Sequence, residues 1–151
     1  MNLTFKEYYN TLKYGSYIAV TPDEKSKEKI KDIIKKLKIK NPIDINDIHV
    51  TLMYSEGKGI PEFFPYPDAV YEGIGCGLAI FGDALVIRLI SPDLHQRFED
   101  LSYRGFKHTY DPYSPHISLS YDYKDEKLDH SIVEDVNFSF TGEYHTFIDP
   151  D

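Results

Sequence analysis

The chain has 151 residues, of which 41% are hydrophobic and 28% charged, the balance of one folded domain with its own core. A net charge of −8 argues against a protein that coats long nucleic acid, because that affinity comes from neutralising many phosphates. No apolar run reaches the roughly 18 residues that span a bilayer, and charges interrupt the N-terminal segment, so we expect a cytoplasmic protein without a targeting segment. Cys76 is the only cysteine, which leaves no internal disulfide and no cysteine-rich zinc site.

The first half of the chain predicts a strand, a helix and a second strand. Residues 15–22, "GSYIAVTP", have the β-branched and aromatic composition of a strand. The "TPDE" at its end predicts a helix that is capped by Thr21 and has Pro22 at its first position. The residues expected on the buried face of this helix are Ile30, Ile33, Ile34 and Leu37. "NPID" at 41–44 ends the helix, and "IHVTLMYS" at 48–55 predicts the second strand.

The second half repeats that order. "ALVIRLI" at 84–90 predicts a strand, and Ser91 and Pro92 again supply a capping hydroxyl and a proline at the start of a helix. The residues expected on its buried face are Leu94, Phe98 and Leu101. "HISLSYD" at 116–122 predicts the closing strand. We therefore expect a single domain, residues 1–151, with a diverged internal repeat of about 15–55 and 84–122; chance similarity of two capped helices is the alternative.

The segments between and after the halves complete the expected fold. Residues 56–68 are rich in Gly and Pro and predict a surface loop. Residues 69–83 predict a strand or strand pair, in which "GIGCG" indicates a bulge or a close backbone approach rather than a nucleotide-binding loop. Residues 136–148 predict a last strand or hairpin arm. The expected fold is α+β, with two pseudo-symmetric lobes of antiparallel sheet backed by helices and an active cleft between them.

Two short motifs, "HVT" at 49–51 and "HIS" at 116–118, place an imidazole and a hydroxyl two residues apart in an aliphatic strand. Because side chains alternate between the faces of a strand, each motif presents both groups on one side and its aliphatic residues to the core. The same alternation assigns further residues to the polar faces (Met53, Ser55 and Ser120) and to the core faces (Tyr54 and Tyr121). If the halves are related by a pseudo-twofold axis, the polar faces converge on one cleft.

Two imidazoles that face each other across a cleft are suited to cleaving a phosphodiester beside a free ribose hydroxyl. One histidine accepts the proton of the attacking hydroxyl, and the other protonates the leaving oxygen; an imidazole pKa near 6.5 makes both states accessible. The hydroxyls of Thr51 and Ser118 would donate to phosphate oxygens, and neither a cofactor nor a metal is required. A zinc site of the two histidines and Asp122 is the rival interpretation, disfavoured because no compact ligand spacing accompanies either histidine.

The remaining histidines lack a serine or threonine two residues further on, and we interpret them as surface or structural groups. They are His95, His108, His130 and His145.

The paired motifs are similar to those of the two-histidine (2H) phosphoesterase superfamily. Five segments resemble, in order, the phage anti-CBASS phosphodiesterases: "GSY" (15–17), "IKNPID" (39–44), "IHVTLMYS" (48–55), "YDPYSPHISLSYD" (110–122) and "TGEY" (141–144). That family opens the 3′–5′ linkages of the cyclic di- and trinucleotides with which bacteria activate anti-phage effectors. The resemblance implies cleavage without metal that leaves 2′,3′-cyclic phosphate ends, and a cyclic di- or trinucleotide as the partner of this chain.

The resemblance also implies roles for individual residues. The implied catalytic residues are His49, Thr51, His116 and Ser118. Ser118 stands where the family more often has threonine, which keeps the hydroxyl. Tyr17 falls on a tyrosine that stacks on a base, and Glu143 on an acid that contacts a base. The chain has no tryptophan, so a second stacking residue would be Tyr144 or Phe147.

Two other functions stay open at this point. One is an RNA-processing enzyme of the same superfamily that acts on 2′,3′-cyclic phosphate ends, which the acidic charge and the closer segment matches disfavour. The other is a non-catalytic protein that sequesters a cyclic nucleotide, which the intact pair of acid and base candidates disfavours.

Overall fold

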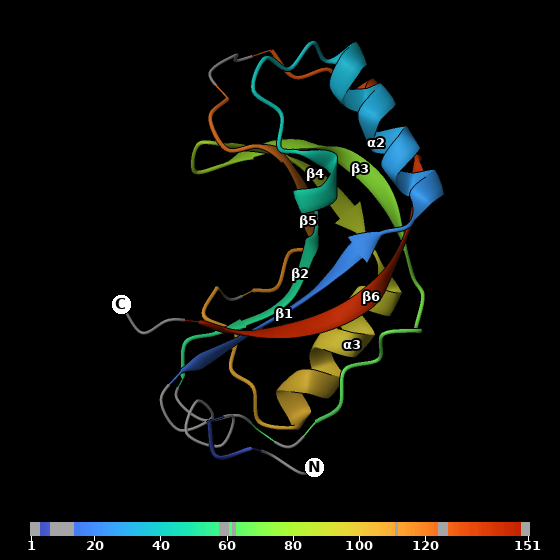
Figure 1. Cartoon of the computed structure of the whole chain (residues 1–151). Helices are drawn as coiled ribbons and strands as arrows, with labels where there is room; N and C mark the ends of the chain where they lie inside the picture. The colour runs from blue at the N-terminus through green and yellow to red at the C-terminus, as the bar shows by residue number, and fades with distance from the viewer. Residues whose placement is uncertain are drawn as a thin grey trace.

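The computed structural model describes residues 4–6, 14–57, 61, 63–110, 112–123 and 127–148. Figure 1 labels the strands β1 (Gly15–Pro22), β2 (Val50–Ser55), β3 (Tyr71–Phe81), β4 (Ala84–Ile90), β5 (His116–Ser120) and β6 (Asn137–Ile148). It also labels the helices α2 (Glu24–Lys36) and α3 (Pro92–Tyr103). Two short 3-10 turns, η1 (Ile45–Asp47) and η2 (His130–Ile132), complete the list. The strands at 15–22, 84–90 and 136–148 therefore form as the sequence predicts. Within the described ranges, no helix is long and apolar enough to cross a membrane.

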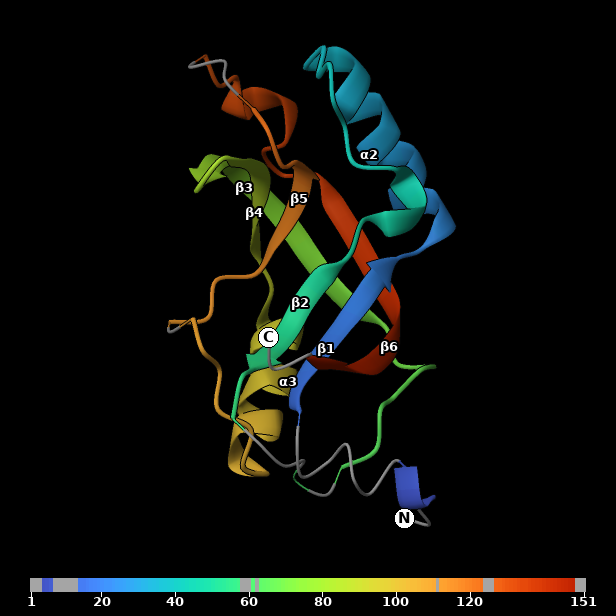
Figure 2. The same ribbon diagram turned by 60° about the vertical axis from the view of Figure 1, so that its left-hand side comes forward.

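The six strands form one antiparallel sheet in the order β2-β1-β6-β3-β4-β5. This order consists of two three-stranded halves, which are joined where Tyr71–Ile74 of β3 pairs with Asn137–Phe140 of β6. The sheet curves so that its edge strands β2 and β5 come side by side, while α2 and α3 lie on the outer side (Figures 1 and 2). The predicted α+β architecture is confirmed, and its two halves share a continuous sheet.

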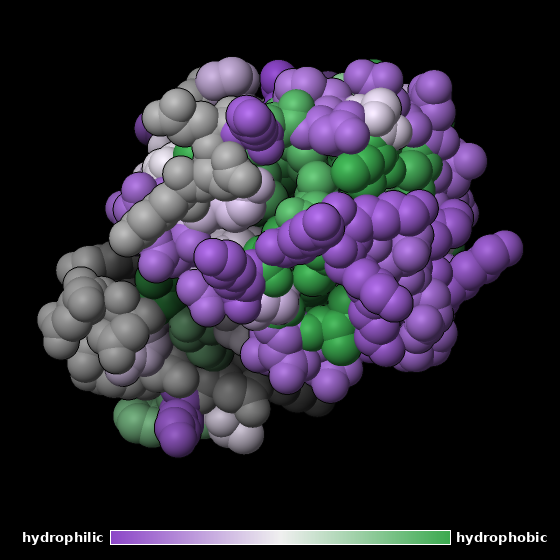
Figure 3. All heavy atoms as spheres, turned by 90° about the horizontal axis from the view of Figure 1, so that it is seen from above, coloured by the Kyte–Doolittle hydropathy of each residue, from purple (hydrophilic) through white to green (hydrophobic). Residues whose placement is uncertain are grey.

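The two faces of the sheet differ in composition. The core face packs against the helices and carries the largest buried side chains, among them Ile18, Leu52, Leu85, Ile87, Ile117, Phe138 and Phe140. Ile30 and Ile33 of α2 and Leu94 and Leu101 of α3 cover this face. The outward side of α2 is hydrophilic, as the right-hand surface in Figure 3 shows. Side chains on the opposite, open face of the sheet include those of Thr51 and His116, and this face is available for a site.

The two helices begin differently. Ser91 caps α3 by accepting a hydrogen bond from the Leu94 backbone N–H, and Pro92 is the first helical residue, as predicted. The predicted start of α2 is wrong: Thr21 and Pro22 end β1, because they pair with β6. Asp23 is the cap instead, and its Oδ1 accepts from the Ser26 backbone N–H at 2.8 Å.

The glycine-rich "GIGCG" segment lies inside the single long strand β3. The pairing with β4 shifts register between Gly75 and Gly77, so a bulge occurs there. A Cβ at Gly75 would collide with the backbone carbonyl of Val133. Both expectations, a bulge and a close backbone approach, are confirmed. The predicted loop at 56–68 contains no helix or strand at its described positions; residues 58–60 and 62 lie outside the described residues.

A second bulge changes which side chains of β2 face the site. Ile18 of β1 pairs with Met53 and Ala19 pairs with Thr51, so Leu52 is the extra residue. Leu52 and Met53 are both fully buried, and Tyr54 moves to the open face beside Thr51. The predicted faces of Met53 and Tyr54 are wrong because simple alternation assumes an uninterrupted pleat.

The same feature occurs in β5. Val86 of β4 pairs with Ser118 and Leu85 pairs with Ser120, which leaves Leu119 unpaired between them. Ser120 is therefore buried, and Tyr121 beyond it is 60% exposed. Ser55 at the end of β2 is also buried. The predicted faces of Ser55, Ser120 and Tyr121 are thus wrong for the same reason.

Candidate active site

The two motif histidines have matching backbone anchors. His49 immediately precedes β2, and its Nδ1–H donates to the Asp47 carbonyl at 2.9 Å; His116 begins β5, and its Nδ1–H donates to the Ser114 carbonyl at 2.9 Å. A carbonyl oxygen only accepts hydrogen bonds, so it places the proton on Nδ1. Nε2 of each ring is thereby left as the nitrogen that can accept or deliver a proton in the site.

The electrostatic surroundings distinguish His116. Burial lowers its pKa, and the nearby charge of His49 lowers it further, whereas the hydrogen bond to the Ser114 carbonyl acts in the opposite direction. The interaction between the two imidazoles shows that they lie near each other in the fold although 67 residues separate them in the chain. A lowered pKa keeps His116 neutral, and able to accept a proton, at neutral pH.

Thr51 is held by two tyrosines. Its Oγ1 and the Tyr17 hydroxyl share a hydrogen bond of 2.8 Å, and its carbonyl accepts from the Tyr113 hydroxyl at 2.7 Å. The ring of Tyr113 stacks on Phe98 at a centroid distance of 4.4 Å, which fixes it against α3. The Ser118 hydroxyl, by contrast, has no hydrogen-bond partner among the residues that the structure describes. One hydroxyl of the pair is therefore pre-oriented, and the other is available to a ligand.

Tyr17 lies beside the first motif, in contact with both Thr51 and His49. Its ring contacts His49 edge-on at a centroid distance of 5.8 Å and Tyr54 at 5.9 Å. Burial raises the pKa of Tyr17 to about 12, so the phenol is neutral and can donate to Thr51. The structure thus adds a hydrogen-bonding role to the predicted stacking role.

An aromatic pocket of about 340 Å³ adjoins the motifs. It is lined by Thr51, Tyr54, Phe81, His108, Tyr110, Pro112, Tyr113, Ser114 and His116. The ring of Phe81 contacts that of His116 at a centroid distance of 4.9 Å, and Tyr54 contacts Tyr110 at 5.4 Å. Sequence reasoning missed Tyr54, Phe81 and Tyr110. Tyr54 could have been suspected from its place in the first motif strand, but nothing near Phe81 in the sequence connects it with His116.

Three of the other histidines make contacts within the fold, and one of them, His108, also lines the aromatic pocket. Nδ1 of His108 accepts from the Tyr54 backbone N–H at 3.0 Å, and Nδ1 of His130 accepts from the Leu78 backbone N–H at 2.9 Å. His145 lies against aromatic rings on the core face, where burial lowers its pKa.

Glu143 does not lie at the site. Arg97 donates to it through Nε and Nη2, both at 2.8 Å, and the Tyr71 hydroxyl and the Tyr66 backbone N–H add bonds of 2.8 Å each. Its side chain is fully buried, so neither oxygen is available to a base. The cause is a bulge in β6 at Gly142, whose φ of +66° shifts the alternation and directs the following carboxylate into the core.

The two alternatives for a second stacking residue lie on opposite faces of β6. Tyr144 pairs with Ala19, which also pairs with Thr51, so Tyr144 is on the open face. Phe147 contacts His145 at 5.0 Å and Tyr14 at 6.2 Å on the core face. Of these two, Tyr144 alone lies on the same face as the catalytic candidates.

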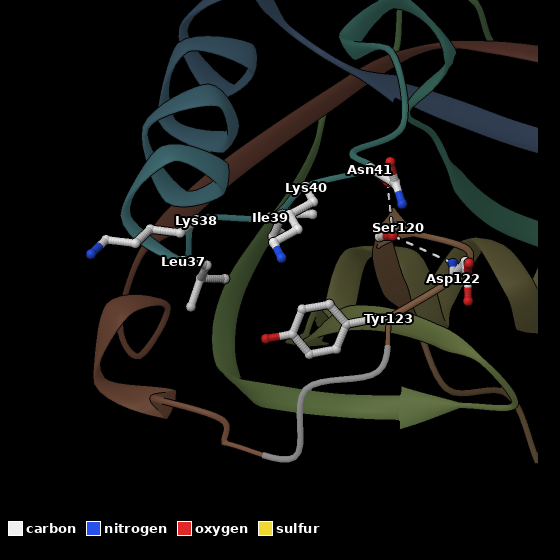
Figure 4. A pocket seen from close by; sticks show the side chains of 8 residues that line it. All are labelled: Leu37, Lys38, Ile39, Lys40, Asn41, Ser120, Asp122 and Tyr123. Carbon is white, nitrogen blue, oxygen red and sulfur yellow. Dashed lines mark hydrogen bonds between the residues drawn. The ribbon is translucent and has the colours of Figure 1, made fainter.

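Another cavity, of about 390 Å³, lies at the end of α2 (Figure 4). It is lined by Leu37, Lys38, Ile39, Lys40, Asn41, Ser120, Asp122 and Tyr123. The Ser120 hydroxyl donates to the Asn41 carbonyl at 2.9 Å and thereby ties the two halves together. None of these lining residues is a histidine, whereas His108 and His116 line the aromatic pocket. The described ranges contain no group of three or more His, Cys, Asp or Glu side chains placed to hold a metal ion.

Comparison with solved structures identifies the fold. A protein of Thermus thermophilus superimposes with a TM-score of 0.60 at 13% identity, covering 89% of this chain and 95% of that one. The apo form of E. coli LigT gives a TM-score of 0.57 at 13% identity, covering 89% and 94%. The fold is therefore that of the two-histidine phosphoesterases.

The sequence places the chain more narrowly. Residues 14–151 match the family model "Anti-CBASS protein Acb1". The anti-CBASS protein Acb1 of Vibrio phage KVP40 is 36% identical over 110 residues, covering 72% of this chain and 73% of the relative. The chain belongs to the Acb1 anti-CBASS family.

Proposed function

We propose that this chain is a phosphodiesterase that opens 3′–5′ linkages of cyclic di- and trinucleotide messengers and so counteracts CBASS defence. The observation that carries the proposal is the pair of imidazoles, both anchored through Nδ1 and both followed by a hydroxyl two residues on, next to an aromatic pocket. Family membership supports the messenger as substrate, because the relatives are named anti-CBASS proteins. The cytoplasm of the infected cell is where such an enzyme would meet its substrate.

The reaction is a transesterification. The ribose 2′-oxygen forms a bond to phosphorus while the bond from phosphorus to the 5′-oxygen breaks, which leaves a 2′,3′-cyclic phosphate and a free 5′-hydroxyl. His116 takes the 2′-hydroxyl proton, since burial keeps it neutral, and His49 delivers a proton to the departing 5′-oxygen. The linear product is an isomer of the ring, because no water is consumed in this step.

Thr51 and Ser118 stabilise the charge on the phosphate. When Tyr17 donates to Thr51 Oγ1, the proton of Thr51 is left to donate to a non-bridging oxygen. The Ser118 hydroxyl donates from the other motif. Tyr54 and Tyr110 offer aromatic faces on which a base can stack, as does Tyr144 on the open face.

The test is incubation with a panel of cyclic di- and trinucleotides in the presence of a chelator, followed by chromatography and mass analysis. Wild-type protein should open at least one ring, while His49→Ala and His116→Ala should each lower turnover about 10²- to 10⁴-fold. Circular dichroism of both variants checks that they fold. A ring that is bound but recovered intact would replace the proposal with sequestration. Activity confined to linear RNA with 2′,3′-cyclic phosphate ends would replace it with RNA processing.

A further inference from the structure

Arg88 is a cation on the open face next to a catalytic histidine. It is the Cα partner of His116 across the β4–β5 pair, so the two side chains emerge from the same face. No other residue within the bounds of the six strands is a lysine or arginine, although the whole chain carries a net charge of −8. Arg88 is exposed, and its guanidinium forms no hydrogen bond or ion pair with any residue that the structure describes.

The surface beside Arg88 is open and carries two exposed isoleucines, with Glu72 further along the same face of β3. On its other side the strand partner is Gly77, which contributes no side chain. Two residues further along the same face, Ile90 pairs with Ile74, and these side chains are 59% and 42% exposed. The corresponding strand of the first half, β1, carries no cation. An unpaired guanidinium at the edge of an exposed apolar surface therefore distinguishes the His116 side of the site.

We infer that Arg88, together with Ile74 and Ile90, forms an accessory subsite for a phosphate of the cyclic substrate other than the one being cleaved. This inference rests on the proposed function. A cyclic dinucleotide or trinucleotide carries at least one phosphate that cannot lie between the two motifs while another is being cut. A guanidinium binds a phosphate through two parallel, charge-assisted hydrogen bonds, and the isoleucines cover the apolar parts of the adjoining nucleoside.

The number of phosphates in the ligand provides the test. Binding is measured by calorimetry in a His49→Ala background, which does not consume the ligand, with 3′,3′-cyclic diadenylate (two phosphates) and the linear dinucleotide ApA (one phosphate). Arg88→Ala should weaken binding of the ring about 10- to 150-fold and that of ApA by less than about 2-fold. The slope of log affinity against log salt concentration, measured for the ring, should decrease by about 1, the value for one lost phosphate contact. Arg88→Lys should recover part of the loss, because it restores the charge without the planar fork.

Kinetics and a matched control complete the design. With the catalytic residues intact, Arg88→Ala should raise KM for the ring while kcat stays within about 3-fold, the pattern of lost ground-state binding. Lys25→Ala removes the same charge from the exposed side of α2 and should leave both constants unchanged. Unchanged ring affinity in Arg88→Ala, or equal losses for the ring and ApA, would overturn the inference. A ring bound through Arg88 but not opened by wild-type protein would support the subsite and refute the proposed function.

Discussion

The hydrogen bond between Tyr17 and Thr51 provides a graded test of how the site is organised. Tyr17→Phe keeps the aromatic face and removes a hydroxyl that lies 2.8 Å from Thr51 Oγ1. A bond of this kind contributes about 0.5–1.5 kcal/mol, so kcat/KM should fall about 2- to 13-fold. Tyr17→Ala also removes the stacking face, worth about 1–3 kcal/mol, and the combined loss of about 1.5–4.5 kcal/mol corresponds to about 13- to 2,000-fold.

A double-mutant cycle with Thr51→Val shows whether Tyr17 acts through Thr51. The assay is kcat/KM for opening a cyclic dinucleotide, with Tyr103→Phe as control, because it removes a phenol hydroxyl from a side chain that is 93% exposed on α3. In the Thr51→Val background, Tyr17→Phe should cost little more, since its partner is already gone. Fully additive losses would refute the reasoning, as would a Tyr17→Phe variant as damaged as Tyr17→Ala.

The remaining predictions concern pH, stability and access. Burial lowers the pKa of His116, and a general base must be neutral, so the acid limb of the pH profile of kcat/KM should lie below the ordinary histidine pKa. Phe81→Ala removes the ring that contacts His116 and should move this limb to higher pH. A limb that does not move would count against His116 as the base. Glu143→Gln removes the buried carboxylate partner of Arg97 and leaves the partly exposed Asp100 as its remaining ion-pair partner. The change should lower the free energy of unfolding by up to about 3–5 kcal/mol with little change in kcat; the opposite pattern would indicate that Glu143 contacts a nucleobase after all. Cys76 is exposed and lies beside Arg88, because its thiol donates to the Arg88 backbone carbonyl. Bound cyclic dinucleotide should therefore slow alkylation of the Cys76 thiol, whereas ApA should not.

Local sequence patterns predict most of the strands and one helix start. The strand at 84–90 and the Ser91–Pro92 start of α3 follow from propensity and capping, which depend on neighbouring residues alone. The start of α2 is wrong because Thr21 and Pro22 satisfy a capping pattern but are held in the sheet by β6. Competition between a local pattern and a distant strand is not visible in the sequence.

The candidate site could be predicted for the part of each strand in which side chains alternate regularly between the two faces of the sheet. The four motif residues come before the bulges. Thr51, His116 and Ser118 lie on the open face by their strand pairing, and His49, which precedes β2, lies there by its contact with the Tyr17 ring. Residues beyond a bulge were assigned to the wrong face, because the extra residue reveals itself only in the register with the neighbouring strand. The internal repeat stays a prediction; the shared Nδ1 anchors are consistent with it.

A glycine bulge explains the error at Glu143. The motif "TGEY" gave no sign that Gly142 adopts a positive φ, which directs the carboxylate toward Arg97 rather than toward the site. Phe81 was missed for a different reason: only the folded sheet brings the end of β3 to the ring of His116.

The mass of the first product tests the central claim most directly. Protein is treated with excess chelator and incubated with 3′,3′-cyclic diadenylate, and the products are separated and weighed by mass spectrometry. Attack by the 2′-hydroxyl predicts a linear product with the same mass as the ring, ending in a 2′,3′-cyclic phosphate, at a rate unchanged by the chelator; an analogue joined only through 2′–5′ linkages should stay closed. A first product heavier by one water, or activity lost to the chelator and restored by zinc or manganese, would contradict the two-histidine transesterification.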